Sequence, residues 1–591
     1  MVVFFHFFVE DIFILNNQFM KIFTSFLFII TFLVSCGDQD QSNETFSSDQ
    51  GLSQEHKKEF KKDLIEVTED IYVGVGYGLA NSIMIETKNS LVIVDTLGSV
   101  ERAEELYQDF REISEKPIAA IVYTHNHLDH LGGATVFYNE NETEIYAQEN
   151  IIYNLDNIAT TIRPIIFQRS ARQFGIPLPE EEIVHQGIGG FLEINDQETL
   201  GLVRPTILFD DSLTIEIDNL KIVLVHVPGE TDDHLYVWIP EKQAVMVGDN
   251  FYRSFANLYA IRGTKFRNPM EWVDSLDRIR LLNAEHLVPS HSRPISGKEN
   301  VEKALTDYRD GIQFVHDQTI RYINKGLTPD EIVQKVKLPK HLAESPYLQP
   351  FYGSISSYVR STFSGYIGWF SGNISDLHPL TVAERAQKLE AMAQRQTKIS
   401  DEAEIALNNG EYQWALELAD MLIALDSNNT QAKNIKAEAA DQLARFQLAS
   451  NDYYFYKTVA GELRNEIDVN PSTPNRVTSE QLQATPMKAI MKSLPVNLNA
   501  DKSVEITKKY EFRFIDSEEV YTIHIRKGVA QLSKIPDSSA EVKVITDQQT
   551  LKEVFAGLKN VAAISLLLAN NTIEVEGGKL EFLKFLGLFT D

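Results

Sequence analysis

Cysteine is almost absent from this chain of 591 residues, which has a single one, Cys36. One cysteine excludes a disulfide framework. It also excludes a metal site built on several thiolates, so any such site must use histidine, aspartate and glutamate. Positive charge is scarce as well, because 55 lysines and arginines stand against 84 aspartates and glutamates, for a formal net charge of −29. A field of that sign repels phosphate backbones and argues against general nucleic-acid binding.

Long apolar runs are also rare, and the one that stands out lies near the N-terminus. After Met20, residues 22–34 are largely apolar, a length typical of a signal peptide and too short to span a bilayer comfortably. The run leads into Cys36, and residues 33–37 (LVSCG) resemble a bacterial lipoprotein signal, in which the cysteine carries the lipid. We therefore predict an exported lipoprotein held at a membrane by a lipid on Cys36. A chance cysteine after an apolar stretch is the alternative.

This prediction places the true start of translation at Met20, which leaves the Phe-rich residues 1–19 outside the protein. A two-part membrane anchor is the alternative for that segment. The residues that follow Cys36 are rich in Ser, Gln, Asp and Asn, a composition typical of a flexible tether.

The length of the chain requires several domains, because single hydrophobic cores stop growing near ~250–300 residues. Residues 64–295 are β-rich with helical interludes. Strand-like runs occur at residues 71–73, 82–85, 91–94 and 121–123, and helical spacing occurs at residues 100–113. This alternation predicts an α/β layered architecture.

The remainder of the chain changes character twice. Residues 298–389 are predicted to be helical with an interruption at 347–379, and residues 401–449 are predicted to form two helices that resemble a tetratricopeptide hairpin. One such hairpin cannot bury its own face, so we expect it to pack on a neighbour or a second chain. A linker at residues 470–478 then precedes a small α+β domain at 479–591.

The strongest signal for chemistry is a cluster of histidines that follows an apolar strand. His125, His127 and His130 lie with Asp129 within six residues, although the whole chain has only 14 histidines. Histidines two residues apart on an extended turn can face one ion, and the Asp-His pair that opens the next helix can face a second. Zinc favours such N and O ligands, and two ions ~3.5–4 Å apart can share one hydroxide. A polar loop with three solvated histidines is the alternative.

This cluster resembles the HxHxDH signature of the metallo-β-lactamase superfamily. The resemblance implies an αββα sandwich and further ligands at later strand ends. By resemblance, His125, His127 and Glu230 hold one Zn²⁺, Asp129, His130 and His291 hold a second, and Asp249 bridges the two. Asp95, at another strand end, is expected to hydrogen-bond the metal loop, and a simple turn aspartate is the alternative.

Glu230 narrows the resemblance to one family within the superfamily, because most members of the superfamily have histidine at that position. The glutamate is similar to that of the alkyl sulfatases, in which an Asn and an Arg spaced as Asn257 and Arg262 bind the sulfate group. An arginine fork matches a tetrahedral oxyanion, and asparagine adds a neutral donor. Residues 352–380 resemble the alkyl-sulfatase dimerisation domain, and the C-terminal region resembles the sterol-carrier-like domain of the same enzymes. A homodimer is implied.

The sequence departs from that family at several positions. The family often has histidine near the positions of Arg253 and Ser357, and without it the general acid is unassigned. Asp249 stands where alkyl sulfatases usually have glutamate. Arg253 and Lys265 add positive charge near the site, which could favour a different anion.

We therefore predict a zinc-dependent hydrolase that cleaves alkyl sulfate esters, such as dodecyl sulfate, with a metal-bound hydroxide. Asp249, Asn257 and Arg262 are the predicted catalytic residues. The alternatives are hydrolysis of a phosphodiester, thioester or β-lactam on the same scaffold, or a non-enzymatic lipid-binding lipoprotein. The predicted domains are a signal region at 1–36, a tether at 37–60, a catalytic domain at 61–300, a helical dimerisation domain at 301–469, the linker and the sterol-carrier-like domain.

Overall fold

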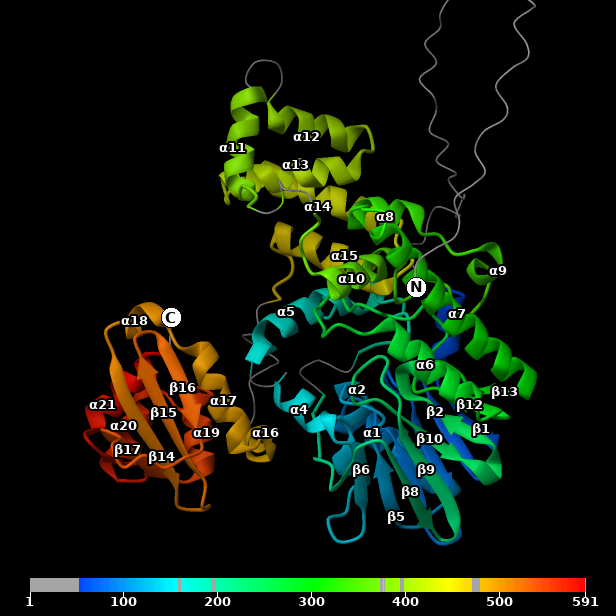
Figure 1. Ribbon diagram of the computed structural model, residues 1–591, viewed down its shortest axis with the longest axis horizontal. Helices are drawn as coiled ribbons and strands as arrows, with labels where there is room; N and C mark the ends of the chain where they lie inside the picture. Colours follow the sequence, from blue (N-terminus) through cyan, green and yellow to red (C-terminus); the bar gives the residue numbers. More distant parts are fainter. Residues whose placement is uncertain are drawn as a thin grey trace, which may run out of the picture. The chain divides into compact units, whose positions relative to one another are not determined.

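The computed structural model describes residues 53–157, 161–192, 198–372, 376, 378–393, 398–469 and 479–589. Cys36, the predicted signal region and the linker at 470–478 lie outside these residues. Two sheets that pack face to face form the centre of the catalytic region (Figure 1).

The first sheet follows the order of the chain from β1 to β7. Strands β1 to β4 are antiparallel, and β4 to β7 are parallel. Its strands are β1 (Asp63–Thr68), β2 (Ile71–Val75), β3 (Ser82–Glu86), β4 (Leu91–Val94), β5 (Ile118–Val122), β6 (Glu144–Gln148) and β7 (Ile207–Phe209). The parallel half places the carboxyl ends of β4 and β5 at one edge of the sheet.

The second sheet has the order β13-β12-β11-β10-β9-β8, with β11 and β12 parallel and the other neighbours antiparallel. Its strands are β8 (Ser212–Ile217), β9 (Leu220–His226), β10 (Leu235–Ile239), β11 (Ala244–Met246), β12 (His286–Val288) and β13 (Ile295–Ser296). The loops after β9, β11 and β12 carry the residues predicted to bind metal.

The two sheets are held together by alternating side chains. In β4, Val92 and Val94 point into the core between the sheets, whereas Leu91 and Ile93 point to the outer face of the first sheet. Helix α1 (Val100–Ile113) covers that outer face through Leu106 and other buried residues. Helices α6 (Pro269–Arg280) and α7 (Lys298–Ile323) cover the second sheet. The αββα sandwich expected from the sequence is therefore confirmed.

The region after the sandwich is helical, as predicted, but two details differ. The interruption expected at residues 347–379 contains helix α10 (Ile355–Ile367), which Ser354 caps by accepting a hydrogen bond from the Ser357 N–H. Residues 399–444 form three helices, not two, because the turns at 409–411 and 426–429 each end a helix. The helices are α8 (Pro329–Lys335), α9 (Lys340–Ala343), α11 (Val382–Ala393), α12 (Ile399–Asn408), α13 (Tyr412–Leu425), α14 (Thr430–Ala444) and α15 (Ser450–Arg464).

The neighbour expected for the helical hairpin is found within the chain. Helices α13 and α14 pack on each other, and α14 packs on α15. Helix α15 in turn contacts α5 (Arg163–Phe174) of the catalytic region, where Arg172 donates two hydrogen bonds, of 2.7 and 2.9 Å, to the Glu462 carboxylate. The remaining short helices of the catalytic region are α2 (Leu128–Leu131), α3 (Ala134–Phe137) and α4 (Asn150–Asn157).

The C-terminal domain has its own sheet, in the order β16-β15-β14-β17-β18, and its own hydrophobic core. Its elements are α16 (Ser479–Ala484), α17 (Met487–Asn497), α18 (Ala500–Ser503), β14 (Thr507–Phe514), β15 (Val520–Arg526), β16 (Val529–Ser533), β17 (Val542–Thr546), α19 (Gln548–Phe555), α20 (Val561–Ala569), β18 (Glu574–Glu576) and α21 (Lys579–Gly587). The predicted α+β composition is therefore confirmed. Helix α20 leaves Val561 and Leu566 exposed.

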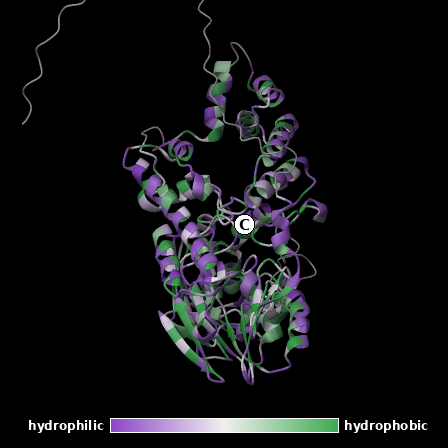
Figure 2. Cartoon of the chain, turned by 90° about the vertical axis from the view of Figure 1, so that its right-hand side faces the viewer, coloured by the Kyte–Doolittle hydropathy of each residue, from purple (hydrophilic) through white to green (hydrophobic). Residues whose placement is uncertain are grey.

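The helices of the chain carry both hydrophobic and hydrophilic residues along their length (Figure 2). This is expected of helices that cover a core with one face and meet water with the other. Within the part of the chain that the structure describes, no helix combines the length and apolar character needed to cross a membrane.

The end of the predicted tether is packed against the catalytic region. Residues His56–Phe60 form a 3₁₀ helix in which His56 and Phe60 are buried. The His56 ring stacks on Phe351 at 4.0 Å, and its Nε2 lies 2.8 Å from the Gly187 carbonyl. The tether therefore differs from the sequence prediction at its end, because apolar and aromatic contacts stabilise residues that polar composition alone marked as flexible.

Burial of His56 predicts a specific sensitivity to acid. Burial, opposed by the Gly187 hydrogen bond, lowers the pKa of His56 to about 4. Between pH 6.5 and about 4 the unfolded chain therefore binds more protons than the folded one, and acid favours unfolding. In the variant His56→Phe, the loss of unfolding free energy between pH 7 and pH 5 should shrink by roughly 2 kcal/mol in denaturant titrations. The same change at exposed His341 should leave that loss unaltered.

Candidate metal centre

The histidine cluster lies at the edge where the first sheet presents its parallel strand ends. His125 and His127 lie in the loop after β5, and Asp129 and His130 lie in α2. His125 and His130 are fully buried, and His127 is partly exposed. Gly132 permits this arrangement, because a Cβ there would lie 1.9 Å from the Gly98 carbonyl oxygen.

The second sheet brings the later residues to the same place. Glu230 follows β9, Asp249 lies in the 3₁₀ turn after β11, and His291 follows β12. All three are buried. Residues more than 160 positions apart in the chain therefore meet at the ends of neighbouring strands.

Six of the seven predicted ligands form two clusters. His125, His127 and Asp249 offer ligand atoms within 4.8 Å of one another, and so do Asp129, His130 and His291. We call these the first and the second cluster. Asp249 also faces the second cluster, since its Oδ1 lies 3.5 Å from His130 Nε2 and its Oδ2 lies 3.2 Å from His291 Nε2. This is the position expected of a bridging carboxylate.

The donor atoms of these clusters fit divalent metal ions. The Nε2 atoms of His125, His130 and His291 and the Oδ1 atom of Asp249 are buried without a hydrogen-bond partner among the described residues. Leaving such groups unsatisfied is costly, and a metal ion would satisfy them. Two ligands about 2.1 Å from one zinc ion at a tetrahedral angle lie about 3.4 Å apart. The observed separations of 3.2–3.7 Å between histidine and carboxylate atoms match that geometry.

Hydrogen bonds on the far side of the rings fix which nitrogen faces the clusters. His130 Nδ1 lies 2.8 Å from Asp95 Oδ2, and His291 Nδ1 lies 2.9 Å from the Leu79 carbonyl. Asp95 also accepts hydrogen bonds from the Thr124 N–H at 2.9 Å and the Ser290 hydroxyl at 2.7 Å. Asp95 therefore contacts the metal loop, as the sequence suggested, and joins it to the segment that carries His291.

This arrangement predicts that the variant Asp95→Asn binds zinc more weakly than the unaltered protein. An amide presents a donor where the carboxylate accepted, so the His130 ring loses the partner that orients it. Loss of such a partner typically lowers metal affinity by about 10–100-fold. Competition with a chromogenic chelator should show that loss for zinc. The metal-free protein should also unfold at a lower temperature, because an amide cannot accept all the hydrogen bonds that the buried carboxylate accepts. The variant Asp211→Asn, at an exposed aspartate, should bind zinc like the unaltered protein.

His234 is a site residue that the sequence did not reveal. Its Nε2 accepts a hydrogen bond of 2.9 Å from the Asp249 N–H, and its ring stacks on His125 at 4.9 Å. Burial lowers the pKa of His234 to about 3, so the ring stays neutral with its proton on Nδ1. His234 thereby positions a residue of the first cluster through the backbone.

Glu230 lies beside the first cluster, not within it. Its Oε1 is 3.9 Å from His127 Nδ1 and 2.7 Å from Arg267 Nη1, and its Oε2 accepts a hydrogen bond of 3.3 Å from the Tyr252 hydroxyl. Burial raises the pKa of Glu230 to about 7, and the Arg267 guanidinium opposes that rise. The carboxylate is therefore close enough to join the first cluster but is held by Arg267 in this structure.

Of the two residues predicted to bind sulfate, Arg262 lies next to the first cluster, whereas Asn257 is connected to it through Tyr252 and Glu230. Arg262 Nη2 is 3.4 Å from His127 Nε2. Asn257 is buried, and its Nδ2 has no hydrogen-bond partner among the described residues. Buried donors without partners are suited to receive an oxyanion.

The other basic residues near the site differ in the groups with which they pair. Arg253 pairs with Glu59 at 3.1 Å, and Lys265 pairs with Asp232 at 2.9 Å, so the extra charge noted in the sequence is neutralised by ion pairs that involve no predicted ligand. Arg267, in contrast, is buried against Glu230 and donates to the Asn257 carbonyl. Arg267 was not predicted from the sequence, although its position five residues after Arg262 in the same loop could have indicated it.

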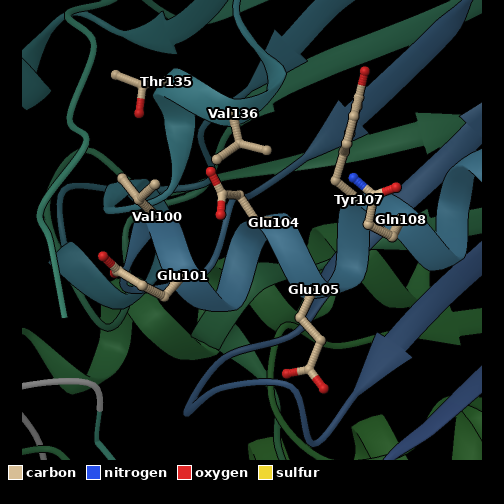
Figure 3. A pocket seen from close by; sticks show the side chains of 8 residues that line it. All are labelled: Val100, Glu101, Glu104, Glu105, Tyr107, Gln108, Thr135 and Val136. Atoms are coloured by element: carbon tan, nitrogen blue, oxygen red, sulfur yellow. The ribbon is translucent and has the colours of Figure 1, made fainter. Parts of the chain in front are cut away.

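A separate hollow of about 700 Å³ lies on the outer helix layer. It is lined by residues of α1 and α3, all labelled in Figure 3. Three of them are glutamates, and none belongs to the clusters. Glu101 accepts a hydrogen bond of 2.7 Å from the Thr199 N–H, and Glu105 pairs with Lys62. The hollow therefore has no evident part in the metal chemistry.

Three family models match successive parts of the chain. The metallo-beta-lactamase superfamily matches residues 75–291, alkyl sulfatase dimerisation matches residues 328–466, and alkyl sulfatase C-terminal matches residues 475–591. Their order is the order of the sandwich, the helical region and the C-terminal domain described above.

Curated proteins and solved structures agree with these matches. The linear primary-alkylsulfatase of Pseudomonas sp. (strain ATCC 19151) is 36% identical over 522 residues, which cover 86% of this chain and 98% of that protein. An (R)-specific secondary-alkylsulfatase of Pseudomonas sp. is 27% identical and covers 89% of this chain and 80% of that protein. The structure of the stereoselective inverting sec-alkylsulfatase Pisa1 from Pseudomonas sp. has the same fold, with a TM-score of 0.82, 23% identity and 92% of each chain covered.

Proposed function

Because the chain belongs to the alkyl sulfatases of the metallo-β-lactamase superfamily, we propose that it hydrolyses sulfate esters of alkyl alcohols with two zinc ions. The observation that carries the proposal is the position of Arg262 beside a pair of metal-ligand clusters that share Asp249, with Asn257 linked to Glu230 through the Tyr252 hydroxyl. An anionic head group and a divalent metal pair therefore have adjoining sites in a strongly acidic protein.

The residues of the site have distinct roles in this proposal. His125, His127, Asp249 and Glu230 hold one zinc ion, and Asp129, His130 and His291 hold the other, with Asp249 shared. Zinc bound there lowers the pKa of water to about 7 and so makes hydroxide available. Arg262 and Asn257 hold sulfate oxygens and orient the ester for attack. His234 and Asp95 keep the ligands in place.

The point of attack decides what the leaving group needs. After attack on carbon, sulfate leaves as a stable anion without a proton. After attack on sulfur, the departing alkoxide needs a proton or a cation. Hydrolysis in ¹⁸O-labelled water separates the two, because the label enters the alcohol in the first case and the sulfate in the second.

We also propose a homodimer. The family model for alkyl sulfatase dimerisation supports it, and so do the exposed apolar side chains at the end of α10 and just beyond, where Trp369 is 72% exposed. Export and anchoring through a lipid on Cys36 is a further proposal, which rests on the N-terminal sequence alone.

The test of the function uses the chain without residues 1–36. Dodecyl sulfate should release inorganic sulfate, the activity should vanish with a chelator, and zinc should restore it. A β-lactam and a phosphodiester, assayed in parallel, should be turned over far more slowly. Faster turnover of either one would replace the proposed substrate, and chelator-resistant sulfate release would exclude the proposed metal chemistry.

A further inference from the structure

Glu230 and Arg267 form an ion pair that is almost completely buried. Their side chains are 3% and 2% exposed, and Arg267 Nη1 lies 2.7 Å from Glu230 Oε1. Glu230 comes from the turn after β9, whereas Arg267 lies just before α6, so the fold brings the pair together across 37 residues. A charge in such a place is costly unless a partner of opposite sign and hydrogen bonds compensate it.

The pair also connects the metal side of the site to its anion side. Arg267 Nη1 donates a hydrogen bond to the Asn257 carbonyl. The Tyr252 hydroxyl donates to Glu230 Oε2 and accepts from the Asn257 N–H at 2.8 Å. Glu230, Arg267, Asn257 and Tyr252 therefore form a closed ring of contacts next to His127.

We propose that Arg267 is a positioning residue that sets the orientation and charge balance of Glu230 as a ligand of the first cluster. A carboxylate at this position brings one more negative charge to the cluster than the neutral imidazole found in most of the superfamily. Arg267 supplies the matching positive charge at Oε1, the same carboxylate oxygen that lies 3.9 Å from His127 Nδ1, and its hydrogen bond to the Asn257 carbonyl orients the guanidinium. This role of Arg267 rests on the proposed metal centre.

The first test measures zinc affinity in the holoprotein by competition with a chromogenic chelator. The variant Arg267→Met removes the charge and the donors but keeps an unbranched side chain. It should lower the affinity for one of the two zinc ions by about 10–100-fold. Arg267→Lys keeps the charge and should recover part of that loss. Arg253→Met is the matched control, because it removes a cation of the same region that contacts Glu59 and Tyr347, and it should bind zinc normally.

The second test is a double-mutant cycle with Glu230→His. If the role of Arg267 is to compensate the negative charge of the Glu230 carboxylate, that role disappears once the ligand is a neutral imidazole. The loss of zinc affinity caused by Arg267→Met should therefore be much smaller in the Glu230→His background than in the unaltered protein. Additive losses in the cycle would overturn the inference, because they would show that Arg267 acts independently of Glu230.

The outcomes separate this inference from the proposed function. Zinc affinity that is unchanged or higher in Arg267→Met, in a protein that hydrolyses dodecyl sulfate, overturns the inference alone. If the protein binds two zinc ions and the double-mutant cycle gives the expected coupling between Arg267 and Glu230, but no alkyl sulfate is hydrolysed, only the proposed function is overturned. Unchanged zinc affinity in Glu230→Gln would overturn the inference as well, because it would remove Glu230 from the ligands.

Discussion

The variant Asp249→Ala is expected to lose at least about a thousandfold in the rate of dodecyl sulfate hydrolysis and to keep at most one zinc ion. Asp249 faces His125 at 3.7 Å, His130 at 3.5 Å and His291 at 3.2 Å, so one change removes a ligand from both clusters. Removing a single donor that stabilises developing charge already costs about 10²–10³-fold. A shared metal ligand supports both positioning and charge stabilisation, so its loss should exceed that range.

Steady-state kinetics and elemental analysis of the same sample check this prediction. The variant Asp274→Asn, at an exposed position of α6, is the control and should match the unaltered protein in both measurements. Asp249→Asn should lie between Asp249→Ala and the control in both rate and zinc content, because an amide oxygen can still bind one metal ion. Retention of two tightly bound zinc ions in Asp249→Ala would contradict the bridging role.

The variant Arg262→Ala is expected to lose about 10²–10³-fold in kcat/KM for dodecyl sulfate while it retains both zinc ions. Arg262 Nη2 lies 3.4 Å from His127 Nε2, which places its charge beside the first cluster without making it a ligand. An arginine fork binds a tetrahedral oxyanion through charge-assisted hydrogen bonds that alanine cannot replace. The defect should therefore appear in catalysis and not in metal content.

Two further variants sharpen this prediction. Arg262→Lys keeps the charge but not the planar fork, so it should recover only part of the loss. Lys265→Met, three residues away, removes a cation that pairs with Asp232, and it should leave kcat/KM nearly unchanged. Equal losses in Arg262→Ala and Lys265→Met would indicate a general effect of positive charge and not a specific sulfate contact.

The sequence predicted the strand ends of the site well because periodicity and turns are local. The run at residues 91–94 is apolar throughout and was predicted as a strand, and in the structure its side chains alternate between two cores. Asp95 and the histidines at 125–130 follow such strands, and parallel strand ends converge at one edge of a sheet. Local pattern therefore predicted the histidine loop, whereas Asp249 and His291, which complete the two clusters from the second sheet, were predicted by resemblance to the family.

The contacts that tune the ligands were not visible in the sequence because they depend on tertiary packing. Nothing in the sequence marked His234, yet its Nε2 accepts a hydrogen bond from the Asp249 N–H where the neighbouring strands β10 and β11 meet. Arg267 was not singled out in the sequence, yet it is buried against Glu230. His56 shows the same limit at the tether, where a partner 295 residues away, Phe351, decides that the segment is packed.

If side chains from four strand ends hold a pair of metal ions, anomalous diffraction at the zinc edge from crystals of the zinc-loaded protein should locate both ions. We expect two peaks, one between His125, His127 and Asp249 and one between Asp129, His130 and His291. A single peak, or peaks away from both clusters, would contradict it.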